Sequence, residues 1–123
     1  MTDHVRQIDA AIVAHDEWKA RLLAAVQAGS SDVNPNEVRA DDRCAFGAWL
    51  SSVELDMKAS LHYSRVCGLH ARFHQAAAEV LKLALGGRGP KALTNLEFGS
   101  DYASASVLLV DEMELWRAEL RRG

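Results

Sequence analysis

Both prolines of this chain lie in two short breaks, and their placement constrains the fold more than any other feature of the sequence. The first break is "AGSSDVNPN" at 28–36, and the second is "GGRGP" at 86–90. Outside these breaks the chain is rich in Ala and Leu, which are among the strongest helix formers. The sequence therefore predicts an all-α fold whose long helices are joined at the two breaks.

Apolar residues before the first break have helical spacing. The predicted first helix covers about 3–28, and residues at steps of three, four or seven mark one face of it. This apolar stripe consists of Ile8, Ile12, His15, Leu22 and Val26. A helix with such a stripe packs that face into a core.

A short helix is predicted in "DDRCAFGAWLSS" at 41–52, after the first break. Asp41 or Asp42 is expected to cap it, because Asp is a preferred residue at helix N-termini. Its apolar face consists of Phe46, Trp49 and Leu50.

Two further long helices complete the predicted fold. One covers about 54–85 and ends at the glycine pair 86–87. The last helix, divided near Gly99, runs to Arg121. A chain of 123 residues suits one domain, so residues 1–123 are expected to form a four-helix-type bundle of three long helices and a short one.

Charge and composition exclude several classes of function. The net charge is −3, so a broad electrostatic footprint for nucleic acid is absent. No stretch approaches the roughly 20 apolar residues of a membrane-spanning helix, and the first residues lack the layout of a signal peptide. We therefore expect a cytoplasmic protein that binds neither nucleic acid nor membrane. In that compartment its two cysteines are thiols, metal ligands or redox sensors rather than a disulfide.

Three histidines occupy positions from which they can meet inside a bundle. His15 lies in the apolar stripe, where by itself it is best interpreted as a buried structural residue. His70 and His74 lie four residues apart, so their imidazoles stand on one helical face and can reach one ion, as in helical zinc sites. The spacing also arises without a metal, so a metal site requires further ligands. His4 and His62 fall outside this group and are expected at the surface.

A cysteine would complete such a site, and the chain offers two. Cys67 falls on the same face as His70 and His74, but three ligands from one straight helix surround an ion poorly. Cys44 lies on a separate segment, which favours it over Cys67, although a free cysteine is often only a small buried hydrophobe. Three His and one Cys would form a closed tetrahedral site of the kind that Zn²⁺ prefers.

Three short motifs follow one another along the chain: "AHDEWKARL" at 14–22, "CAFGAWL" at 44–50 and "HARFH" at 70–74. They resemble the motifs H-x-x-W, C-x-[LF]-G-x-W and H-x-x-x-H of the chemoreceptor zinc-binding (CZB) family, in the same order, with 28 and 25 residues separating the ligands. The resemblance selects Cys44 over Cys67 as the sulfur ligand. The zinc ligands that it implies are His15, Cys44, His70 and His74.

The resemblance also implies partners. Domains of this family form helical bundles that pair as homodimers, and they are usually attached to methyl-accepting chemoreceptors or diguanylate cyclases, whose output they regulate. No output domain is present here, so the expectation is a free-standing member or an excised domain that acts on a chemoreceptor assembly or a diguanylate cyclase in trans. Trp18 and Trp49 occupy the aromatic positions of the motifs, and we expect them to pack behind the site.

A closed four-ligand site favours regulation over catalysis, because a catalytic zinc usually keeps one position open. We therefore expect no enzyme activity, and we expect zinc occupancy to modulate chemotaxis or cyclic-di-GMP synthesis. A rival hypothesis is redox sensing through zinc-bound Cys44, since the resemblance includes members that respond to hypochlorous acid through this cysteine. Two more rivals are a dimerisation module, with or without a structural metal, and a metal-dependent enzyme that uses Asp16, Glu17 or Asp42.

Overall fold

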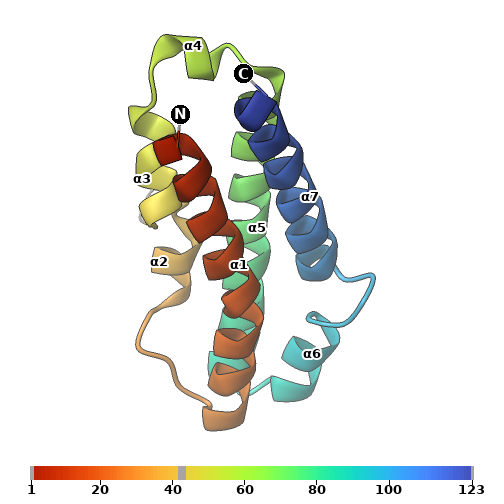
Figure 1. Cartoon of the computed structure of the whole chain (residues 1–123). Coiled ribbons are helices and arrows are strands. Elements are labelled where there is room, and N and C mark those ends of the chain that lie inside the picture. Colours follow the sequence, from red (N-terminus) through yellow and green to blue (C-terminus); the bar gives the residue numbers. More distant parts are fainter. Residues whose placement is uncertain (1, 42–43, 123) are drawn as a thin grey trace.

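Three long helices form the frame of the molecule in the computed structural model, which describes residues 2–41 and 44–122. They are α1 (Thr2–Ala28), α5 (Leu61–Leu85) and α7 (Asp101–Arg122), and each packs against the other two. Helix α5 runs parallel to α1, and α7 runs antiparallel to both (Figure 1). The start of α1 and the end of α7 consequently lie at the same end of the bundle. The predicted all-α bundle is confirmed.

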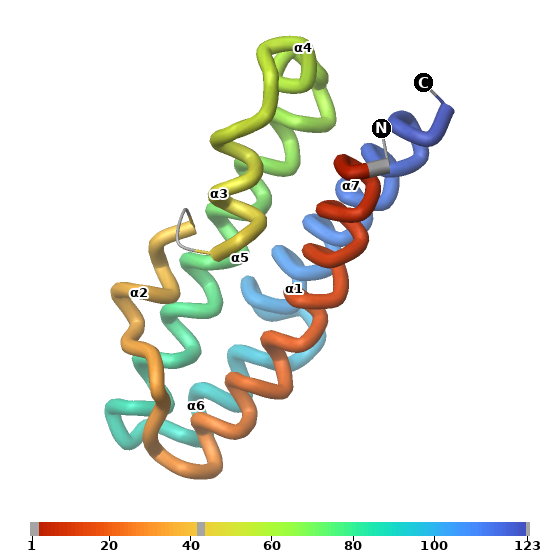
Figure 2. The backbone as a smooth tube through the Cα atoms, turned by 60° about the vertical axis from the view of Figure 1, so that its left-hand side comes forward, coloured from red at the N-terminus to blue at the C-terminus, as the bar shows by residue number. Residues whose placement is uncertain are grey.

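The fourth position of the bundle holds a helix that is broken in two. Helix α2 (Pro35–Arg39) packs on α5, and α3 (Ala45–Ser52) packs on α1. The two follow one another along the bundle, so the break between them lies near its middle (Figure 2). Sequence reasoning predicted α3 but not α2. The start of α3 therefore lies near the middle of the bundle, where α1 and α5 contribute buried residues to the core.

Two very short helices lie at opposite ends of the bundle, α4 (Leu55–Lys58) and α6 (Gly89–Thr94) (Figure 1). The single helix predicted over 54–85 was wrong, because the chain breaks between α4 and α5. Ser60 causes the new start, since its hydroxyl accepts the His62 backbone N–H at 3.2 Å. The predicted division near Gly99 is confirmed, and this glycine has a φ of 88° that other residues rarely adopt.

The starts of α2 and α3 have local causes in the sequence. Asn34 and Glu37 form a reciprocal capping box around the first turn of α2, and Pro35 is its first residue. Helix α3 is capped by Cys44, so the prediction of Asp41 as its cap was wrong; Asp42 lies outside the described residues. A thiol that caps a helix is held in a fixed direction, and this matters for the site.

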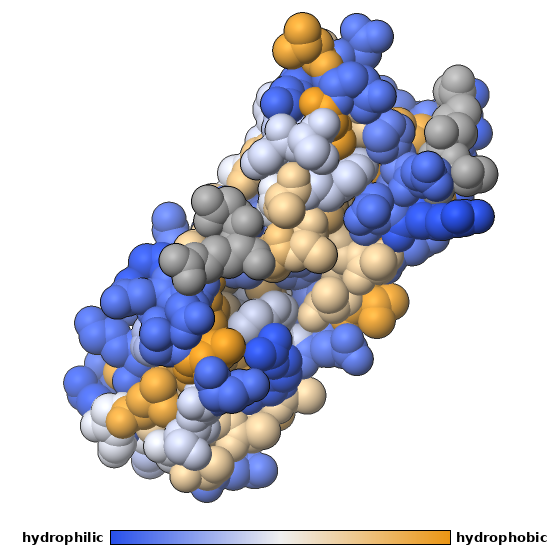
Figure 3. Space-filling view, turned by 90° about the vertical axis from the view of Figure 1, so that its left-hand side faces the viewer, coloured by the Kyte–Doolittle hydropathy of each residue, from blue (hydrophilic) through white to orange (hydrophobic). Residues whose placement is uncertain are grey.

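Side chains from the long helices fill one continuous core. The predicted stripe of α1 faces it, with Ile8, His15 and Leu22 buried and the remaining members half-buried. The described residues on the surface over α2 and α3 mix apolar and hydrophilic side chains (Figure 3). Among the described helices, none combines the length and apolar character needed to cross a membrane. The polar side chains buried in the core, within the part of the chain that the structure describes, are His15, His70 and His74.

Candidate metal centre

Four metal-ligating side chains from three helices meet in the middle of the bundle. They are His15 on α1, Cys44 at the start of α3, and His70 and His74 on α5. One ligand atom from each lies within 4.8 Å of the others. We name these four residues the donor cluster. The structure thus brings together all four predicted ligands, whereas Cys67 is a half-buried free thiol outside the donor cluster.

Three distances show how tightly the donor cluster is drawn together. The Cys44 Sγ lies 3.3 Å from His70 Nε2 and 3.6 Å from His74 Nε2. The two Nε2 atoms of His70 and His74 are 3.0 Å apart. In a tetrahedral zinc site, bond lengths of about 2.05 and 2.3 Å place two nitrogens about 3.3 Å apart and a nitrogen about 3.6 Å from a sulfur. The spacing of these donors therefore suits a zinc-sized cation.

Hydrogen bonds at Nδ1 fix the tautomers of two histidines. His15 Nδ1–H donates to the Ala11 carbonyl at 2.7 Å, and His74 Nδ1–H donates to the Val38 carbonyl at 2.8 Å. A carbonyl oxygen only accepts, so the neutral rings carry their proton on Nδ1 and leave Nε2 as a bare lone pair. Metal-binding histidines are usually held in this way.

One nitrogen of the donor cluster has no hydrogen-bond partner. His15 Nε2 is buried, and its lone pair finds no donor among the described residues. Leaving a buried polar atom unsatisfied costs about 1–3 kcal/mol. A thiol proton on Cys44 can serve only one acceptor at a time, while a cation at the centre would satisfy His15 together with the other donors. The donor cluster therefore fits a metal ion better than a hydrogen-bonded core.

Burial sets the protonation of the donor cluster. It lowers the pKa of His15 and His74, and it lowers the pKa of His70 to about 3 with further help from the neighbouring imidazoles. Burial raises the pKa of the Cys44 thiol, and the Gly47 N–H that it accepts opposes this rise. At neutral pH the metal-free donor cluster thus holds three uncharged imidazoles and one protonated thiol. A metal ion needs to displace only the thiol proton.

Aromatic side chains surround the donor cluster. Phe46 and Phe73 meet the His15 ring edge-on, with centroids 5.8 and 5.0 Å away. Trp49 stacks on Phe46, which confirms its expected packing role. Trp18 is half-buried, as Trp49 is, and packs against the core at the rim of the site with its ring 6.4 Å from the His74 ring, so its expected packing role is confirmed as well. This shell keeps water from most sides of the donors.

The other two histidines are not the surface residues that the sequence suggested. The side chains of His4 and His62 are 24% and 23% exposed. His4 pairs with Glu54 at 3.2 Å, and His62 pairs with Glu112 on α7. These histidines join distant parts of the chain and are separate from the donor cluster.

Sequence reasoning missed two features next to the donors. The Val38 carbonyl that orients His74 comes from α2, and a backbone acceptor leaves no mark in a side-chain pattern. Arg21 lies with its guanidinium 4.2 Å from the centre of the Trp18 ring. Its signal was available, since Trp18 and Arg21 are three residues apart on a helix and hence neighbours on its surface.

Fold and site together define a helical-bundle protein whose core holds three histidines and one cysteine placed so that they could bind one metal ion. A family model described as "Chemoreceptor zinc-binding domain" matches residues 15–81, which is more than half of the chain and contains the whole donor cluster. The chain therefore belongs to the CZB family, as its three motifs indicated. Zn²⁺ is the cofactor that this family and donor cluster support. Comparisons with curated proteins and with solved structures gave no match.

Proposed function

We propose that this chain, as a single domain over residues 1–123, is a zinc-binding regulatory domain. The donor cluster supplies the zinc ligands, and zinc occupancy modulates a signalling output, in chemotaxis or in cyclic-di-GMP synthesis. The unpartnered, buried Nε2 of His15 carries the proposal, because a hydrogen-bonded core would not leave this atom facing three other metal donors. Membership of the CZB family supports zinc as the ion.

The donors come from three different helices, so zinc binding can hold these helices in one relative arrangement. His15 belongs to α1, Cys44 to the start of α3, and His70 with His74 to α5. When bound, the ion supplies four strong bonds that fix the register of these helices. The His74 bond to the Val38 carbonyl extends the link to α2. A signal requires two arrangements of the bundle that bind zinc with different affinity, because equal affinity would shift neither.

A closed shell argues for regulation rather than catalysis. Four protein donors fill a tetrahedral site and leave no position for substrate or water. Asp16 and Glu17, considered as catalytic groups, are exposed on α1, and Asp42 lies outside the described residues. We therefore propose that the chain is not an enzyme.

The proposed assembly is a cytoplasmic homodimer that acts on a partner in trans. The partner is a chemoreceptor assembly or a diguanylate cyclase. The description of the family names chemoreceptors, and the motif resemblance adds the cyclases. Sedimentation equilibrium with zinc and with chelator tests the dimer, and a single monomeric species under both conditions would contradict it.

Metal content is the direct test of the zinc site. Tag-free protein is purified without chelator, offered zinc, washed and analysed by elemental mass spectrometry. Wild type and Cys67→Ala should each retain about one zinc per chain, whereas Cys44→Ala and His15→Gln should retain far less. A wild type that holds no zinc would sink the proposal. Titration then separates reversible sensing from a permanent ion that merely structures a dimerisation module.

Redox sensing through Cys44 is a second candidate function. A hollow in the surface reaches Cys44 and His74, so a small oxidant can approach the sulfur. Hypochlorous acid would oxidise the Cys44 thiolate to a sulfenic acid with release of chloride, which removes the sulfur ligand and frees zinc. If about one equivalent of oxidant releases the zinc, and does so in Cys67→Ala as well as in wild type, the result would support this function. Zinc that stays bound until the protein unfolds would contradict it.

A further inference from the structure

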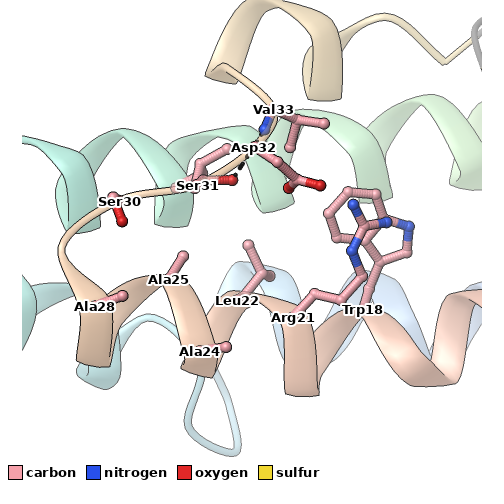
Figure 4. A pocket seen from close by; sticks show the side chains of 11 residues that line it. Trp18, Arg21, Leu22, Ala24, Ala25, Ala28, Ser30, Ser31, Asp32 and Val33 are labelled. Carbon is pink, nitrogen blue, oxygen red and sulfur yellow. Dashed lines mark hydrogen bonds between the residues drawn. The ribbon is translucent and has the colours of Figure 1, made fainter.

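Two hollows adjoin along the last turns of α1. The first, of about 250 Å³, is lined by two members of the donor cluster, Cys44 and His74. The second, of about 340 Å³, lies between α1 and residues 30–33 (Figure 4). Trp18, Arg21 and Val33 line both hollows. These shared residues therefore form the partition between the approach to the donors and the neighbouring surface.

Two of the shared residues are stacked on one another. The Arg21 guanidinium lies 4.2 Å from the centre of the Trp18 ring, and both side chains point from α1 toward residues 30–33 (Figure 4). The Trp18 ring in turn meets the His74 ring edge-on at 6.4 Å. Arg21 is exposed and Trp18 half-buried. The pair thus connects the solvent to a zinc donor through two contacts.

We propose that the Arg21–Trp18 pair narrows the open hollow that leads to Cys44 and in this way gates the approach to the metal site. It sets the rate at which small zinc-coordinating molecules and thiol reagents reach Cys44, and it does not set zinc affinity. The inference rests on the proposed zinc function. Arg21 and Trp18 are not metal donors, and they take no part in the hydrogen bonds that orient His15 and His74. Separating Arg21 from Trp18 therefore leaves the donor cluster intact.

Opening the gate requires only that one cation–π contact be broken. At an exposed position such a contact corresponds to about a two- to fivefold change in an equilibrium or rate. Removing the guanidinium should therefore accelerate the loading and the release of zinc by the same modest factor. The ratio of the two rates, and with it the dissociation constant, should stay constant.

Exchange kinetics with matched variants test the gate. Zinc uptake by metal-free protein and zinc release to excess EDTA are followed by stopped flow for wild type, Arg21→Ala, Trp18→Phe and the control Lys19→Ala. Lys19 carries the same charge on the same helix, is exposed and lines neither hollow. Arg21→Ala should speed up both rates about two- to fivefold with an unchanged dissociation constant, and Trp18→Phe should give a smaller increase, because a phenyl ring still attracts the guanidinium but more weakly. Unchanged rates, or an altered affinity with unchanged uptake, would overturn the gate.

A second measurement separates the gate from an effect of charge and from the zinc proposal itself. Metal-free protein in a Cys67→Ala background reacts with a neutral disulfide, dithiodipyridine, or with an anionic one, dithiobis(nitrobenzoate). A gate predicts that Arg21→Ala accelerates both reactions. Slower reaction with the anionic reagent alone would mean that Arg21 attracts anions and would overturn the gate. This arm needs no zinc, so failure of the zinc proposal and failure of the gate are distinguishable.

Discussion

The Gly47 backbone N–H donates to the Cys44 sulfur at 3.3 Å, so the residue that caps α3 also belongs to the donor cluster. The same sulfur therefore has two functions: it begins a helix, and it faces the imidazoles of α5. A backbone N–H at a helix start also stabilises a thiolate, so the Gly47 N–H opposes the rise that burial causes in the pKa of Cys44. Substitutions at this position can separate the two functions.

In metal-free protein, Cys44→Ser should keep the cap and Cys44→Ala should lose it. A serine hydroxyl is a better N-cap than a thiol, so the free energy of unfolding of the serine variant should lie within about 0.5 kcal/mol of wild type, and that of the alanine variant about 0.5–1 kcal/mol lower. Urea unfolding in the presence of chelator measures both. Zinc should stabilise only the wild type, because neither variant offers sulfur. Equal stability of the two variants without metal would show that the Gly47 contact does not hold α3.

Zinc binding at pH 7 should release about one proton per ion. Burial lowers the pKa of the three histidines in the donor cluster, so they are already neutral, and it raises the pKa of Cys44, so the thiol is the group that must ionise. Calorimetric titration in buffers of different ionisation enthalpy gives the number directly. Release of two or more protons would mean that the imidazoles are charged in the metal-free protein.

The metal-free protein should lose stability as the pH falls below about 6.5, the ordinary pKa of histidine. The pKa of each of the three histidines in the folded protein lies below its value in the unfolded chain. Between these two pKa values the unfolded chain therefore binds protons that the folded protein does not bind. The contribution of these histidines to the free energy of unfolding is complete above pH 6.5. It is lost as the pH falls toward the folded pKa, which is about 3 for His70.

Each of these buried histidines steepens the decline by up to about 1.4 kcal/mol per pH unit. Urea unfolding between pH 7.5 and 5.5 with chelator measures the slope. His70→Gln should reduce it by roughly a third, since one of three such groups is removed. A free energy of unfolding that is flat over this range would contradict the burial of neutral imidazoles.

The sequence predicted the donor cluster well because each donor stands in a strongly patterned context. His15 belongs to a helical apolar stripe, and the four-residue spacing of His70 and His74 places both on one face. The choice of Cys44 over Cys67 needed an argument about how ligands surround an ion, together with the motif resemblance. Both the helical period and the way ligands must surround an ion can be used to predict a site from residue spacing alone.

The parts that were missed depend on local competition or on the backbone. The break before α5 arises because Ser60 caps a new helix inside a stretch with continuous helical propensity. Helix α2 has only five residues, too few for a periodic pattern, although its Asn34 and Glu37 capping box was present in the sequence. The partial burial of His4 and His62 results from their pairing with glutamates on distant segments, which spacing along the chain does not reveal.

Zinc should protect the broken fourth helix more than the rest of the bundle. Helices α2 and α3 have five and eight residues, and helices this short are not stable without tertiary contacts. Two of their attachments pass through the donor cluster, namely Cys44 at the start of α3 and the Val38 carbonyl that His74 holds. Helix α7 contributes no donor. Metal therefore bears on α2 and α3 directly and on α7 only through global stability.

Hydrogen exchange with mass spectrometry resolves this difference. In metal-free protein, amides in 35–52 should exchange faster than those of α5 and α7, because short helices open locally. Zinc should slow exchange in 35–52 by about tenfold or more and should slow α7 by a smaller factor. The control is Cys44→Ala with zinc present, in which the extra protection of 35–52 should vanish. Equal slowing across the whole chain would mean that zinc stabilises the bundle without ordering its fourth helix. That result would contradict the proposal that zinc fixes the arrangement of the helices that carry its donors.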